Sequence, residues 1–86
     1  MIEQFAEKIF ITVLALTKPD GSIVPLRILW EDGRRWDIDR VLDVRPGVAR
    51  KAGGEGIRFL CRISGHEKEL WFSHGRWFVE GKSTQN

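Results

Sequence analysis

Cysteine is almost absent from this chain of 86 residues, which contains Cys61 alone. A single cysteine cannot form an internal disulfide, whereas a secreted domain of this size usually contains several disulfides. We therefore expect a protein of a reducing compartment, the cytoplasm.

Long hydrophobic runs are also absent. The longest apolar stretch, Ile9 to Leu16, is interrupted by Thr12 and is well short of the ~18 residues that span a bilayer. No basic segment precedes an apolar stretch at the amino terminus. The sequence therefore predicts no signal peptide, no transmembrane anchor and no membrane partner.

The composition favours one folded domain. Hydrophobic residues make up 42% of the chain and charged residues 30%, with a net charge of +2. This balance excludes wholesale disorder, and the length excludes a second domain. We expect a single domain over residues 1–80, followed by a polar carboxy-terminal tail over residues 81–86 that frays.

Turn signals recur at short intervals along the chain. They are Pro19-Asp20-Gly21, Glu31-Asp32-Gly33, Ser64-Gly65-His66 and Ser73-His74-Gly75. Proline, aspartate and glycine suit the corner positions of tight turns, so each signal predicts a hairpin between two strands. About six short strands follow from this spacing. The first eight residues fit either an extension of the first strand or a helix, because Ile2, Phe5, Ala6 and Ile9 also have helical spacing.

Alternation of apolar and polar residues predicts which faces are buried. Ile57, Phe59, Cys61 and Ile63 share one apolar face of a strand, and Arg58 and Arg62 share the other. A second strand places Val24, Leu26, Ile28 and Trp30 on one face. The adjacent Val41 and Leu42 break the alternation, which predicts a bulge that curls the sheet.

These strands and the ordered loop from Pro46 to Gly56 predict an all-β fold. We expect a small antiparallel curled sheet, or a partly open barrel of the SH3-like or Sm-like kind. The chain has no crossover helices, which excludes a doubly wound α/β fold.

Four segments together resemble a group of short uncharacterised bacterial proteins, chiefly from Gram-positive anaerobes. The segments are Ile23–Arg34, Trp36–Arg45, Lys51–Ile63 and Trp77–Glu80. The resemblance covers most of the chain and implies no activity, cofactor or catalytic residue.

The polar inventory does not favour an enzyme. Cys61 lies on an apolar face, where a thiol acts as a small hydrophobe, and the turns that hold His66 and His74 fall at opposite ends of one strand. Asp37 and Asp39 share a strand face, but neighbouring arginines explain them better than a bound cation does. We therefore expect no catalytic residues, no metal and no cofactor.

Positive charge is concentrated between Arg45 and Arg62. This segment has a charge of +4, from five basic residues and Glu55, although the whole chain has only +2. Beside the basic pair Arg50-Lys51, Gly53, Gly54 and Gly56 could expose backbone N–H groups to a phosphate. In nucleotide-binding loops, however, the glycines lead into a helix, whereas here they lead into a strand. Four tryptophans are too many for so small a core, so at least one large aromatic side chain is expected on the surface, beside this patch.

The leading hypothesis is a non-enzymatic module that binds nucleic acid through this basic face and the glycine-rich loop. The predicted site consists of Arg45, Arg50, Lys51, Arg58, Arg62 and Trp71. The alternative is a protein-interaction or self-associating module, in which the arginines meet an acidic protein surface and the exposed aromatic is the anchor.

Overall fold

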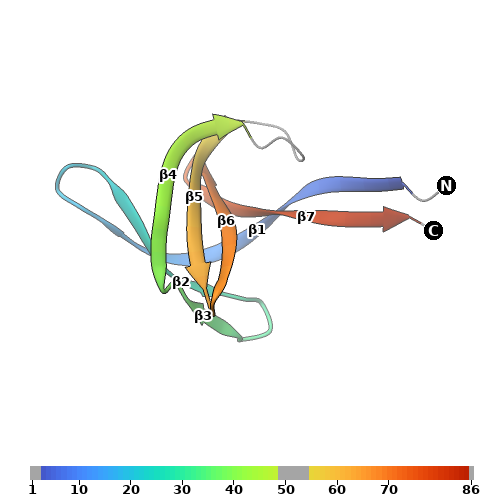
Figure 1. Ribbon diagram of the computed structural model, residues 1–86, viewed down its shortest axis with the longest axis horizontal. Helices are drawn as coiled ribbons and strands as arrows, with labels where there is room; N and C mark the ends of the chain where they lie inside the picture. The colour runs from blue at the N-terminus through green and yellow to red at the C-terminus, as the bar shows by residue number, and fades with distance from the viewer. Residues whose placement is uncertain (1–2, 49–54, 86) are drawn as a thin grey trace.

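The computed structural model describes residues 3–48 and 55–85. These residues form seven strands and no helix. The strands are β1 (Glu3–Thr17), β2 (Ile23–Leu29), β3 (Arg35–Asp37), β4 (Arg40–Val48), β5 (Glu55–Ile63), β6 (His66–Ser73) and β7 (Arg76–Gln85). They form one antiparallel sheet in the order β3-β2-β1-β7-β6-β5-β4, which curls into a half-barrel (Figure 1). The predicted all-β curled sheet is confirmed.

Two hairpins are closed by two-residue turns. In the turn Ser64-Gly65 both residues have positive φ, 51° and 78°, and in His74-Gly75 the values are 50° and 77°. Such turns match the twist of the flanking strands, because the backbone must be left-handed at both corners. They fix the register of β6 on both sides, with Ile63 opposite His66 and Ser73 opposite Arg76.

The two ends of the described chain pair with each other. β1 is a strand from Glu3 onward, not a helix, and its first nine residues pair with nearly all of β7, from Glu3 opposite Gln85 to Ile11 opposite Trp77. The expected polar tail is therefore part of β7 as far as Gln85. The paired segments form a two-stranded arm that projects from the body of the sheet (Figure 1).

Bulges decide which side chains face inward. The expected bulge in β4 is confirmed by a register shift between Val41 and Asp43. A second shift lies in β2, where Leu14 and Ala15 face Arg27 and Pro25, so that Leu26 is the additional residue. The prediction of one apolar face from Val24 to Trp30 is wrong for this reason: Ile28 is buried, whereas Leu26 is 36% exposed.

Both faces of the sheet contain buried side chains. The inner face holds the main core of Ile28, Phe59, Cys61, Ile63, Leu70 and Trp77. A smaller cluster of Trp71 and Phe78 lies on the outer face. No helix of the described residues is long and apolar enough to cross a membrane.

Candidate functional site

Strand β5 directs the two central arginines of the predicted basic patch to its outer face. Phe59, Cys61 and Ile63 are buried on the inner face, while Arg62 is exposed and Arg58 is half-buried on the other. The predicted alternation of this strand is confirmed from Phe59 to Ile63, whereas Ile57, predicted to be buried on the same face, is 37% exposed near the start of the strand. Arg50 and Lys51 belong to residues 49–54, which lie outside the described residues.

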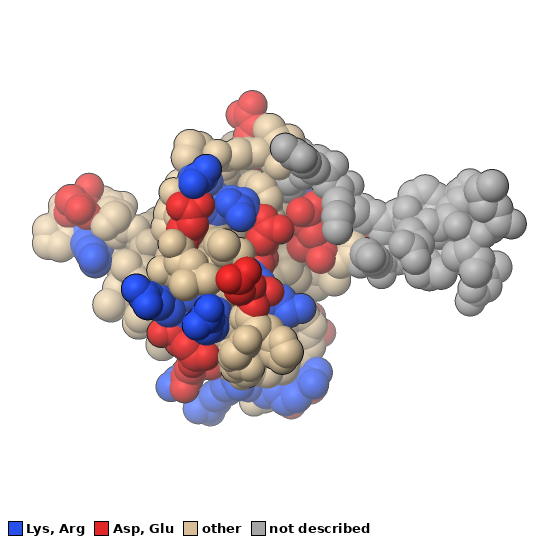
Figure 2. Space-filling model, in the orientation of Figure 1, with Lys and Arg blue, Asp and Glu red and all other residues tan. Residues whose placement is uncertain are grey.

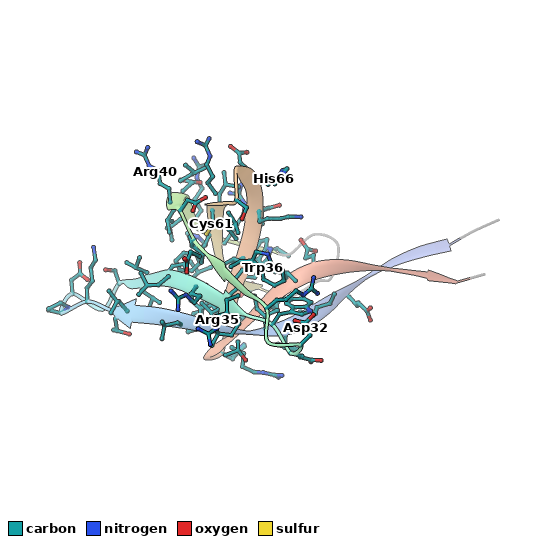
Figure 3. All side chains as sticks on the ribbon, turned by 90° about the horizontal axis from the view of Figure 1, so that it is seen from below. Asp32, Arg35, Trp36, Arg40, Cys61 and His66 are labelled. Atoms are coloured by element: carbon teal, nitrogen blue, oxygen red, sulfur yellow. The ribbon has the colours of Figure 1, made fainter. Side chains whose placement is uncertain are left out.

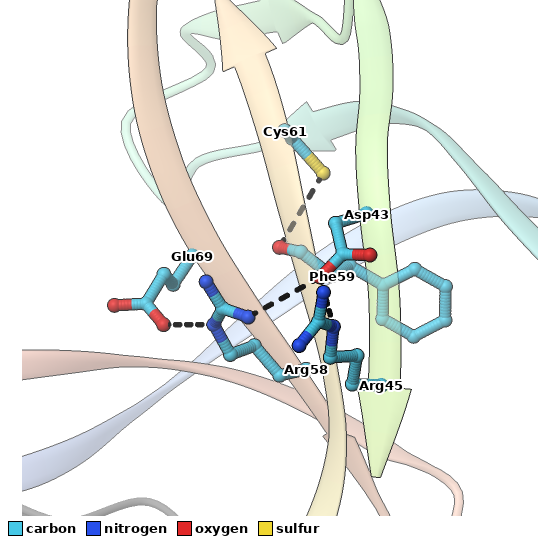
Figure 4. Close-up of polar contacts among 6 residues, drawn as sticks. All are labelled: Asp43, Arg45, Arg58, Phe59, Cys61 and Glu69. Atoms are coloured by element: carbon cyan, nitrogen blue, oxygen red, sulfur yellow. Dashed lines mark hydrogen bonds and ion pairs between the residues drawn. The ribbon is translucent and has the colours of Figure 1, made fainter. Parts of the chain in front are cut away.

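Carboxylates lie among these arginines (Figure 4). The Arg58 guanidinium forms an ion pair with Glu69, from β6, and its Nη1 lies 3.6 Å from Oδ2 of Asp43, from β4. Nε of Arg45 lies 2.7 Å from the same Asp43 oxygen. A phosphate group would have to compete with two carboxylates for Arg58, which lowers the gain from binding it.

Arg62 lies in a different environment. It lies directly opposite Arg40 of β4 on one side and opposite Glu67 of β6 on the other. Basic and acidic side chains are interspersed over the face shown in Figure 2, without a uniformly basic area. The structure thus places Arg45, Arg58 and Arg62 on neighbouring strands, but surrounds them with acids.

Trp71 is not the exposed aromatic residue that the sequence analysis expects. It is only 3% exposed, because its ring stacks on Phe78 at a centroid distance of 6.2 Å and an interplanar angle of 11°. Its indole also extends toward Gly47 in β4. Among the side chains whose burial is described, Phe10 in β1 is an exposed aromatic residue, at 44%, and the Arg76 guanidinium lies 3.5 Å above its ring.

Cys61 is shielded from solvent, and the two histidines lie at opposite ends of β6. Cys61 is fully buried, and desolvation raises the pKa of its thiol to about 11, so the thiolate is scarce near neutrality. His66 and His74 flank β6 at opposite ends, about 25 Å apart along an extended strand. Figure 3 shows His66 near the end of the sheet where Arg40 lies, away from Trp36.

Metal-binding geometry is also not seen among residues 3–48 and 55–85, where no three His, Cys, Asp or Glu side chains cluster. A carboxylate considered for a cation forms an ion pair with an arginine. Asp37, one of the acids considered for a cation, accepts a hydrogen bond of 2.6 Å from Nε of Arg27 on the neighbouring strand. This cross-strand ion pair is the explanation that the sequence analysis favoured.

An exposed apolar surface on β1 and β2 escaped the sequence analysis. Phe10, Leu14 and Leu16 alternate along the outer face of β1 and are 44%, 52% and 55% exposed. Leu29 of β2, 36% exposed, lies opposite Thr12 on the same face. We call these four side chains the outer apolar face.

The signal for this face was present in the run from Ile9 to Leu16. A strand that is apolar at both odd and even positions has two apolar faces, and a half-barrel buries only one of them.

Comparison of the chain with protein families, with curated proteins and with solved structures finds no match. The SH3-like or Sm-like character of the sheet, and the resemblance to short bacterial proteins, therefore stay predictions.

Proposed function

We propose that this protein is a non-enzymatic interaction module that binds a protein partner on the outer apolar face. One observation carries the proposal: Phe10, Leu14, Leu16 and Leu29 are exposed on the same side of two paired strands. Soluble proteins rarely leave contiguous apolar side chains exposed, and such patches mark interaction sites.

Basic groups border this face. Arg76 stacks on Phe10, Nζ of Lys8 lies 5.1 Å from the centroid of Phe78, and Arg27 faces Leu14 across the strands. An apolar centre with a polar rim is the usual anatomy of a protein interface. The partner that fits is an apolar protein surface with acidic groups at its edge.

The proposed module has no catalytic role, and the high pKa of the Cys61 thiol supports this part of the proposal. Nucleic-acid binding is the second candidate. Its support is the juxtaposition of Arg40 and Arg62, which face each other directly across β4 and β5. The ion pairs of Arg45 and Arg58 with Asp43 and Glu69 make it the weaker candidate.

The test compares three double variants of the full chain as baits in lysate of the native cell. Leu14→Gln/Leu16→Gln removes the apolar face. Val44→Gln/Val48→Gln is the matched control, because these residues are similarly exposed, at 50% and 55%, but lie on β4 at the opposite edge of the sheet. Arg58→Gln/Arg62→Gln tests the basic patch.

We expect the first double variant to lose a bound protein that wild type, the control and the arginine variant all retain, with or without nuclease. Binding that nuclease removes, that falls steeply with salt and that the arginine variant lacks would overturn the proposal and support nucleic-acid binding.

A further inference from the structure

Strands β6 and β7 separate partway along their length. They pair only from Ser73 opposite Arg76 to Trp71 opposite Phe78. Beyond this point β7 continues beside β1, while β6 stays paired with β5 as far as His66. The segment from His66 to Leu70 is therefore an open edge of the sheet on the side of β7.

The turns determine which backbone groups this edge presents. The two residues that flank a two-residue turn are hydrogen-bonded to each other through both of their backbone N–H and C=O groups. Along an antiparallel strand, the N–H and C=O groups of successive residues point alternately to the strand on one side and to the strand on the other. Since His66 flanks the turn to β5, residues 66, 68 and 70 bond to β5. The N–H and C=O groups of Glu67 and Glu69 point to the side where no described strand pairs with them.

A cleft of about 860 Å³ lies beside this edge. Its inner side is lined by apolar residues, among them Trp30, Trp36, Leu70 and Val79. Trp30 and Trp36 are a cross-strand pair whose rings meet edge to face, with centroids 5.8 Å apart. Its outer side is lined by Arg58, Glu67, Glu69 and Glu80.

Acidic residues lie on both strands where they separate. Extending the register from Trp71 and Phe78 by two residues would place Glu69 directly opposite Glu80. Like charges directly opposite each other do not favour an antiparallel pair. A basic residue on a strand inserted here would lie between Glu80 and Glu69, which already pairs with Arg58.

We propose that the cleft binds an extended segment of a partner protein as an additional strand beside β6. The outward N–H and C=O groups of Glu67 and Glu69 pair with the backbone of the segment. Its alternate side chains face the two sides of the cleft: apolar ones contact Trp30, Trp36 and Val79, and a lysine or arginine lies near Glu67 and Glu69. Three acids and only one base on the outer side favour this charge.

Exposed polar side chains on the inner side of β6 give the edge selectivity. Lys68, which is positively charged, and His66 are exposed there and line the cleft. Inward-pointing charges on an edge strand discourage indiscriminate pairing. The edge therefore accepts a segment of alternating basic and apolar residues in preference to a wholly apolar one.

The proposal is tested by amide hydrogen exchange, followed residue by residue with NMR on the full chain. The probes are two blocked seven-residue peptides, one alternating lysine with valine and the other alternating glutamate with valine. In the free protein we expect the amides of Glu67 and Glu69 to exchange at least tenfold faster than those of Lys68 and Leu70. The lysine peptide should slow the two glutamate amides at least tenfold at saturation, and the glutamate peptide should leave them unchanged.

A charge reversal provides the second measurement. Glu67→Lys should weaken binding of the lysine peptide about tenfold, and its matched control Glu31→Lys, in the exposed turn before β3, should not. Leu14→Gln/Leu16→Gln should leave peptide binding unchanged, because the proposed function uses a different surface.

Three results would overturn the proposal. One is that both peptides bind equally well or that neither peptide binds. Another is slow exchange of the Glu67 and Glu69 amides in the free protein at every concentration, which would mean that its own chain covers the edge. The third is slow exchange only at high protein concentration, which would make a second copy the occupant.

Discussion

Gly47 and Gly56 lie directly opposite each other across β4 and β5, but only Gly56 has no room for a side chain. A Cβ atom on Gly56 would lie 2.9 Å from the carbonyl oxygen of Phe72 and 3.2 Å from Cβ of Ser73. A Cβ atom on Gly47 would meet only the Trp71 ring, at 3.8 Å, which is ordinary van der Waals contact.

We therefore expect Gly56→Ala to lower the free energy of unfolding by about 1–3 kcal/mol, since β6 would have to move away from β5. Gly47→Ala is the control and should change it by less than about 0.5 kcal/mol. Urea unfolding followed by tryptophan fluorescence measures both. Equal losses in the two variants would show that the close approach of β5 and β6 at Gly56 is absent in solution.

Cys61 should make stability depend on pH above 9. Burial raises the pKa of its thiol from the ordinary value of 9.0 to about 11. Between these values the unfolded chain loses the proton while the folded chain keeps it, so ionisation favours the unfolded state. Stability is fully present below pH 9 and falls as the pH rises from 9 to 11.

The comparison is with Cys61→Ala, measured by urea unfolding in the presence of a reductant. The variant should lack this part of the decline. A thiol reagent should also label native Cys61 slowly at pH 7.5 and rapidly after unfolding. Rapid native labelling would place the thiol at the surface, with β5 shifted by one residue.

Arg58 and Arg62 should differ in their contribution to stability, although they share a strand face. Arg58→Gln leaves Asp43 and Glu69 without their common cation, and Arg58 is only 29% exposed. We expect a loss of about 1 kcal/mol, near the upper end for surface ion pairs. Arg62→Gln should cost less than about 0.5 kcal/mol. A double-mutant cycle of Arg58→Gln with Glu69→Gln should show a coupling that 1 M salt reduces.

Trp71→Phe should be tolerated far better than Trp71→Ala. Nε1 of Trp71 is buried and has no hydrogen-bond partner among residues 3–48 and 55–85, and a buried unpaired donor costs about 1–3 kcal/mol. Phenylalanine removes that donor and keeps a ring to stack on Phe78. The net change should lie within about 1 kcal/mol, against a loss of about 3–5 kcal/mol for alanine. If phenylalanine costs as much as alanine, the indole nitrogen has a partner in solution.

Local signals predicted the hairpins and the all-β fold class, because turn chemistry and two-residue alternation depend on a few neighbouring residues. The turns at Ser64-Gly65 and His74-Gly75, the inner face of β5 and the bulge near Leu42 were all visible in this way. The bulge at Leu26 was not, because Pro25 and Leu26 fit an unbroken alternation when the strand is considered without its partner.

The candidate sites depended on contacts between distant segments. Burial of Trp71 requires Phe78 from β7 and Gly47 from β4, and neutralisation of Arg58 requires Asp43 and Glu69 from two other strands. The position of an arginine in the sequence shows its charge but not the acids that the fold brings beside it. The open edge of β6 likewise arises from the path of β7, which leaves it for β1.

The pairing of β1 with β7 has a consequence for biosynthesis. Every other pair of adjacent strands joins neighbours in the chain order, but β1 must wait for the segment from Arg76 to Gln85 to leave the ribosome. Until then the hairpins β1–β2 and β5–β6 can form, while the segment of β1 from Glu3 to Ile11, which ends in the apolar Ile9, Phe10 and Ile11, has no partner strand. Such a late, long-range closure is slow and exposes an aggregation-prone strand, so a nascent chain halted before residue 76 should depend on chaperones far more than the finished protein does.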